Sequence, residues 1–222
     1  MKLEVPVIRQ APSSCDCCYA CFAMILAFYG EDVSIEDLKA TMEDWFLTTL
    51  SGDLLERGYS VRMKTLHPYL FTLADAGRLH SPRELLARFD WVEENAKLDD
   101  DGKLALAYAQ SFVRLGGEIE VGVPTAQDIR AEVDAGHPLV AAFEHRFLAG
   151  DRPGSYLHAN VITGIDDELI YVNDPLWDDR GGQKSYPIEA FLYAIHLATL
   201  TDLDNGSLFM FRPPGDAARF GG

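Results

Sequence analysis

Basic residues are scarce in this sequence of 222 residues: Lys and Arg total 19 against 35 Asp and Glu, a formal net charge of −16. A surface of this charge repels the phosphate backbone of nucleic acids and anionic membrane surfaces. A nucleic-acid-binding role is therefore disfavoured, and any substrate is expected to be neutral or basic.

Long apolar runs are also missing. No run approaches the roughly 18 to 20 residues that a membrane helix requires, and residues 1–10 contain no apolar core of a signal peptide. The sequence therefore predicts no membrane span and a cytoplasmic location. It predicts nothing about the oligomeric state.

Cysteine is rare and confined to one short segment. The four cysteines are Cys15, Cys17, Cys18 and Cys21. A disulfide framework spreads its cysteines so as to close long loops, so this cluster indicates a reactive or metal-binding site instead. Structural zinc sites usually join two separated pairs, whereas the last of these cysteines lies inside an apolar run. A zinc or thiol-binding module remains an alternative, and no metal or cofactor is predicted.

The first half of the chain has mainly helical patterns. An apolar run over 19–29, closed by a glycine, predicts a buried helix that starts close to Cys17. Ser34 resembles the first residue of a capping box and predicts a second helix through about Leu50. A block over about 66–116 is also mainly helical and is interpreted as an insertion or an elaborated part of a helical lobe.

The second half has strand patterns. Its candidate strands are short segments rich in β-branched or aromatic residues and bounded by Gly, Pro or Asp. They are Glu118–Val121, Leu139–Phe143, His158–Thr163, Leu169–Val172 and Ser207–Phe211. An earlier strand is predicted in the first half, where apolar and polar residues alternate at 59–63. The prediction is one α+β domain over 1–222, with a mainly helical lobe over 1–117 packed on a mainly antiparallel β lobe over 118–222.

The cysteine segment carries a family resemblance. Gln10–Gly30, QAPSSCDCCYACFAMILAFYG, resembles the nucleophile segment of the double-glycine leader peptidases that process bacteriocins, and of their stand-alone relatives. These are papain-like cysteine peptidases. Their pattern is a Gln, then Asp-Cys-Gly, then Ala, Leu and Met three, five and seven positions after the Cys. Counting from Cys17 gives Ala, Phe and Met at those positions, which selects Cys17 as the nucleophile.

The segment departs from the family pattern in two places. Cys18 stands where the family has Gly, and the gap from Gln10 to Cys17 is about one residue longer. A thiolate at a helix N-terminus is stabilised by the helix dipole and by exposed N–H groups. Gln10 is the candidate side-chain donor to the oxyanion, together with the backbone N–H of Cys17.

One histidine lies in a recognisable context. Residues 158–164, a charged turn at 166–168 and residues 169–175 predict a β-hairpin that resembles the family's His strand and Asn-Asp-Pro strand end. If the loop is centred on Asp166, the numbers of two paired residues add up to 332, and Asp174 lies directly opposite His158. If the centre instead lies between Asp166 and Asp167, the Asp174 side chain points to the other face of the hairpin. The histidines without such a context are His67, His80, His137, His145 and His196.

The resemblance implies a papain-like fold with a Cys17, His158 and Asp174 triad. The implied activity is cleavage of a peptide or small amide through a thioester on Cys17. An acyltransferase or ligase with the same triad and an amine acceptor remains an alternative. The C-terminal Gly221-Gly222 resembles the product of a double-glycine peptidase, which gives the hypothesis that the tail enters such a cleft.

Overall fold

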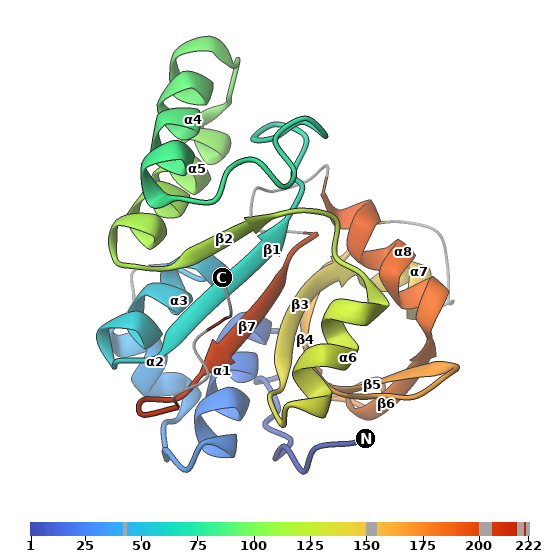
Figure 1. Cartoon of the computed structure of the whole chain (residues 1–222). Coiled ribbons are helices and arrows are strands. Elements are labelled where there is room, and N and C mark those ends of the chain that lie inside the picture. The colour runs from blue at the N-terminus through green and yellow to red at the C-terminus, as the bar shows by residue number, and fades with distance from the viewer. Residues whose placement is uncertain (42–43, 150–154, 200–205, 217–219, 221–222) are drawn as a thin grey trace.

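The computed structural model of the chain describes residues 1–41, 44–149, 155–199, 206–216 and 220. Within them, seven strands form one sheet in the order β2-β1-β7-β3-β4-β5-β6, with helices on both faces (Figure 1). The strands are β1 Ser60–Thr65, β2 Glu118–Val121, β3 Leu139–Glu144, β4 Leu157–Ile165, β5 Leu169–Asp174, β6 Gly182–Pro187 and β7 Leu208–Arg212. The helices are α1 Cys17–Phe28, α2 Ile35–Thr41, α3 Leu47–Glu56, α4 Pro82–Asn95, α5 Asp100–Arg114, α6 Ala126–Asp134, α7 His145–Ala149 and α8 Ile188–Ala198.

The expected combination of helices with a mainly antiparallel sheet is confirmed, with two additions. β1 pairs with β7, so both halves of the chain build the one sheet. β1 and β2 pair in parallel, whereas the other described strand pairs are antiparallel. The first half of the chain therefore supplies one strand inside the sheet, β1, as well as most of the helices.

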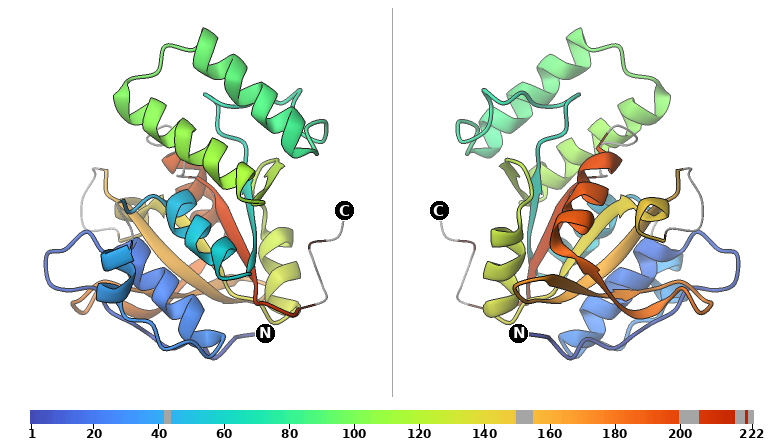
Figure 2. Two further views of the ribbon diagram at one scale, coloured as in Figure 1. Left: turned by 90° about the vertical axis from the view of Figure 1, so that its left-hand side faces the viewer. Right: turned by 90° about the vertical axis from the view of Figure 1, so that its right-hand side faces the viewer.

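Two hydrophobic clusters cover the two faces of the sheet. Along β3, Val140 and Ala142 join the cluster that contains α1, while Leu139, Ala141 and Phe143 join the cluster that contains α6 and α8. Successive residues of a strand point to opposite faces, so β3 is buried on both sides. α4 and α5 lie side by side and project from the remainder of the molecule (Figure 2).

Helix α1 follows the sequence prediction. It begins at Cys17, its residues from Tyr19 to Leu26 are buried, and it packs against β4. It ends before Gly30, which has φ +91°, a conformation that costs a glycine little. Asp16 precedes the helix, but its side chain makes no capping hydrogen bond and instead pairs with Lys39 at 3.1 Å.

The prediction of one long second helix is wrong. Ser34 does cap a helix, since its Oγ accepts from the N–H of Asp37 at 3.1 Å, but α2 ends at Thr41 and α3 starts at Leu47. Just before α3 the carboxylate of Asp44 accepts the N–H of the next residue at 2.7 Å. Such a local bond offers the backbone an alternative to helical pairing.

The block over about 66–116 is mainly helical as expected, and its two helices are α4 and α5. Ser81 and Glu84 form a complete capping box before α4. The acidic stretch 99–102 starts the second helix: Asp99 caps α5 and Asp100 is its first residue. The helices of the described residues are too short or too polar to span a lipid bilayer.

Candidate active site

Cys17 is the first residue of α1 and is partly buried. Its side chain lies beside Cys18, the His158 ring and the backbone N–H of Ala159. A hydrogen bond from Cys18, followed by a hydrogen bond and the charge of His158, holds the pKa of the Cys17 thiol well below its usual range although burial opposes this. The surroundings therefore favour the thiolate, which is the nucleophilic form of cysteine.

His158 lies near the start of β4 and is buried. Its Nε2 lies 2.8 Å from Oδ1 of Asp174, and its Nδ1 is buried. Burial lowers the pKa of His158, but the hydrogen bonds and negative charges of Asp174 and Cys17 outweigh it and raise the pKa to about 9. Both shifts therefore favour a pair of thiolate and imidazolium.

Asp174 ends β5 and its side chain is fully buried. Oδ1 accepts from His158 Nε2 and from the Leu176 N–H at 2.9 Å, and Oδ2 accepts from Asn160 Nδ2 at 3.3 Å. Burial raises the pKa of Asp174, but hydrogen bonds from His145 and His158 outweigh it, and the net shift is downward. The carboxylate stays ionised because these donors replace the water it has lost.

The predicted hairpin exists, but its predicted register is wrong. Next to the turn, Ile165 pairs with Ile170, so the numbers of paired residues add up to 335. Beyond a bulge, Val161 pairs with Asn173, and the numbers add up to 334. Neither sum is the expected 332. The continued register puts Asp174 opposite Asn160, so the Asp174 carboxylate reaches His158 diagonally across the strand pair.

The bulge at Thr163 determines the face on which Asp174 lies. Without the bulge, the pairing next to the turn, in which residue numbers add up to 335, would continue along both strands. Asp174 would then lie on the face opposite to His158. The N-terminal segment occupies the bulge: the Leu3 N–H donates to the Thr163 carbonyl at 2.7 Å, and Lys2 forms a bridge to Gly164. A Cβ on Gly164 would stand 2.8 Å from the Met1 carbonyl, so this crossing requires glycine.

Gln10 is buried in the loop that leads to Cys17. Its backbone N–H donates to the Pro175 carbonyl at 2.8 Å, and its Nε2 donates to the Ser14 carbonyl at 2.7 Å. The loop contains Ser13 at φ 61°, an unusual conformation for a residue other than glycine. Gln10 thus lies beside the end of β5, and one hydrogen of its amide remains for another acceptor.

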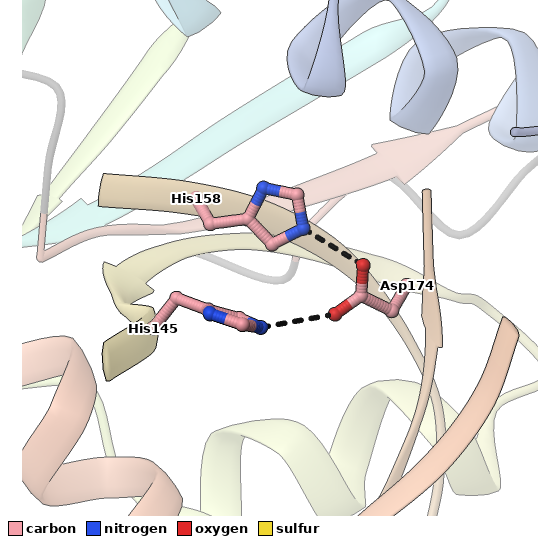
Figure 3. A group of neighbouring side chains, drawn as sticks. All are labelled: His145, His158 and Asp174. Carbon is pink, nitrogen blue, oxygen red and sulfur yellow. Dashed lines mark hydrogen bonds and ion pairs between the residues drawn. The ribbon is translucent and has the colours of Figure 1, made fainter. Parts of the chain in front are cut away.

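His145 is part of the cluster, and the sequence analysis missed it. Its Nε2 lies 3.5 Å from Oδ2 of Asp174, and its side chain is 4% exposed. Figure 3 shows the rings of His145 and His158 reaching the two oxygens of the same carboxylate. The position directly after β3 was the available signal, because β3 pairs with β4 and brings His145 beside His158.

The cluster of His145, His158 and Asp174 has the side chains of a metal site, but its spacing is that of a hydrogen-bonded network. Two ligands of one tetrahedral zinc ion stand about 3.4 Å apart, since each bond is about 2.1 Å long. The 2.8 Å between His158 and Asp174 is a direct hydrogen bond. Cys21 is fully buried in α1, and burial raises the pKa of its thiol, which disfavours the alternative four-cysteine site.

The C-terminal Gly221-Gly222 lies outside the described residues. The ring of Phe220 stacks against Arg62 and Arg212, each 4.6 Å from its centroid.

Comparison with known proteins agrees in part with the resemblance. The model of the Peptidase_C39 like family matches residues 95–196, less than half of the chain, and the match contains His158 and Asp174 but not Cys17. No curated protein matches the chain.

Two solved structures match this chain over nearly the whole length of both chains. A protein from Bacillus anthracis described as a C39-like peptidase is 17% identical over 96% of this chain and 98% of its own, with a TM-score of 0.46. A double glycine motif protease from an AMS/PCAT transporter, in complex with the leader peptide, is 16% identical over 96% and 94%, with a TM-score of 0.34. Scores this low leave the fold to be judged from the chain itself.

Proposed function

We propose that this chain is a cysteine-dependent hydrolase that cleaves a peptide or amide bond through a thioester on Cys17. The observation that carries the proposal is the continuous contact from the Cys17 thiol through His158 to Asp174, with a lowered thiol pKa and an imidazole pKa of about 9. The family match over 95–196 supports a peptidase type of activity independently.

In the first half of the reaction, the thiolate of Cys17 attacks the carbonyl carbon and a C–S bond forms. The carbonyl electron pair moves to oxygen, and the imidazolium of His158 gives its Nδ1 proton to the leaving nitrogen as the C–N bond breaks. Asp174 accepts from Nε2 throughout, which leaves Nδ1 directed at the reacting atoms. The products of this half are a free amine and an acyl-enzyme thioester.

In the second half, neutral His158 takes a proton from water while the water oxygen attacks the thioester. The C–S bond breaks, the acid product leaves, and the thiolate and imidazolium pair forms again. In both halves an oxyanion develops near the N-terminus of α1, where the first N–H groups of a helix have no acceptor within the helix. The remaining amide hydrogen of Gln10 is the proposed side-chain donor to it.

The test is a short iodoacetamide pulse at neutral pH, followed by mapping of the alkylated cysteine by mass spectrometry. Cys17 should react fastest because its thiolate is favoured, and Cys17→Ala should abolish hydrolysis of p-nitrophenyl acetate. Cys15→Ala is the matched control, since Cys15 is exposed and two residues away. Faster alkylation of another cysteine, or hydrolysis that survives Cys17→Ala, would overturn the proposal.

Hydrolysis and acyl transfer proceed through the same thioester and differ in the group that attacks it, which is water in hydrolysis and an amine in acyl transfer. Adding an amine to the p-nitrophenyl acetate reaction and analysing the products distinguishes them. Hydrolysis predicts that acetate remains the main product, whereas a dominant acetylated amine would identify an acyltransferase. The peptide substrate would then be sought among neutral and basic sequences, given the net charge of −16.

A further inference from the structure

His145 makes a contact for which the proposed reaction has no use. It directly follows β3 as the first residue of α7, its side chain is 4% exposed, and its Nε2 lies 3.5 Å from Oδ2 of Asp174. A buried polar side chain normally has a partner, and the partner described for this ring nitrogen is the carboxylate of Asp174. The two histidine rings lie next to each other, and each reaches a different oxygen of the Asp174 carboxylate (Figure 3).

The two oxygens of Asp174 are held unequally. Oδ1 has two short contacts, from His158 at 2.8 Å and from the Leu176 N–H at 2.9 Å. Oδ2 has two longer ones, from Asn160 at 3.3 Å and from His145 at 3.5 Å. Removing His145 would leave Oδ2 with one weak donor in a fully buried place, where a missing donor is costly.

Other groups around His145 do not take over this contact. Its ring meets Tyr156 and His158 almost perpendicularly, at 5.7 Å and 5.0 Å between centroids. The carboxylate of Glu144 accepts from Ser155 and from the backbone N–H groups of Arg146 and Tyr156, so it is occupied within its own loop. The titratable groups that face the network are therefore Asp174, His158, Tyr156 and, through His158, Cys17.

We infer that His145 is a positioning residue of the site. By donating Nε2–H to Oδ2, it fixes the plane of the Asp174 carboxylate so that Oδ1 stays aimed at His158. The inference rests on the proposed triad and adds a member to it that touches neither the thiol nor the substrate.

Two variants separate this role from simple packing. His145→Phe keeps a ring of similar shape against Tyr156 but removes the donor, whereas His145→Gln removes the ring but keeps an N–H donor. If positioning is the role, Phe lowers the turnover of p-nitrophenyl acetate about 10-fold or more, in line with the loss of an outer hydrogen-bonding partner, and Gln stays within about 3-fold of the wild type. If packing is the role, the order is reversed.

A second readout is the pH dependence of Cys17 alkylation by iodoacetamide. A loosened Asp174 stabilises the His158 cation less, and the thiolate then loses part of its partner. The midpoint of alkylation should therefore move to higher pH in His145→Phe and stay in place in His145→Gln. Unchanged turnover and midpoint in the Phe variant, a midpoint moved to lower pH, or equal losses in both variants would overturn the inference.

The controls keep this result apart from the proposed function and from misfolding. If Cys17→Ala retains activity, the proposed function fails and the inference fails with it; if only His145→Phe behaves as wild type, the inference fails alone. Circular dichroism checks each fold. Should the Phe variant be unfolded, His145→Leu replaces it and the same comparison with Gln applies.

Discussion

Asp174→Asn is the most informative change at this site, because it keeps the shape of the side chain and removes its charge. The four contacts of the carboxylate all come from N–H groups, of His158, Leu176, Asn160 and His145. Two of these N–H donors reach each oxygen of the carboxylate. An Asn side chain has an NH2 group in place of one oxygen, so two N–H donors face this NH2 group whichever way the amide is turned. His158 also loses the anion that stabilises its positive charge.

The size of the effect follows from the pKa of His158. That pKa is about 9, compared with an ordinary value of about 6.5, and one unit corresponds to about 1.4 kcal/mol. The difference, about 2.5 pKa units or about 3 kcal/mol, is a net effect: burial lowers the pKa, and Asp174 and Cys17 together raise it by more, so it sets only the scale of what Asp174 adds to the cation. We therefore expect Asp174→Asn to reduce turnover of p-nitrophenyl acetate by about 10²-fold, and more if the ring also loses its orientation.

The pH dependence of the same variant provides a second check. In the wild type, His158 has a raised pKa, so the stability that its cation provides is full below about pH 6.5 and is lost as the pH rises through about 9. Asp174 has a lowered pKa, so its contribution is present above its ordinary value of about 3.9 and is lost in acid. Cys17 alkylation and thermal unfolding between pH 5 and 10, each measured for both proteins, test these signs. Wild-type turnover in a folded Asp174→Asn variant would refute the reasoning.

Four further outcomes are expected. His158→Ala should abolish turnover, measured with p-nitrophenyl acetate, because His158 moves the proton in both halves of the proposed reaction. Gln10→Ala should lower the rate of acylation about 10²-fold in stopped-flow measurements, with an effect confined to KM arguing against an oxyanion role. Deleting Thr163 should slip the hairpin by one residue and abolish activity and Cys17 alkylation selectivity, whereas a fully active deletion would show that the bulge is dispensable. Cys18→Ala should move the alkylation midpoint of Cys17 to higher pH, since the Cys18 hydrogen bond is the largest contribution to the lowered thiol pKa, and no movement would remove Cys18 from this role.

The sequence alone predicted the elements that have strong local patterns. The uninterrupted apolar run of α1, the alternation in β1 and the short strand segments of the second half each matched an element of the structure. The pairing of Cys17 with His158 and Asp174 was also expected, and the structure brings these three side chains together. β6 was missed because its residues, from Gly182 to Pro187, are mostly polar and its outer side is a sheet edge.

Tertiary structure decided what depends on contacts between distant residues. The face on which Asp174 lies depends on a bulge at Thr163, and the bulge is filled by the N-terminal segment, more than 150 residues away in the sequence. His145 has no pattern around it and joins the site only because β3 pairs with β4. Local sequence specifies a helix or a strand through its periodicity, but the register between strands is specified by packing and hydrogen bonds that form only in the folded chain.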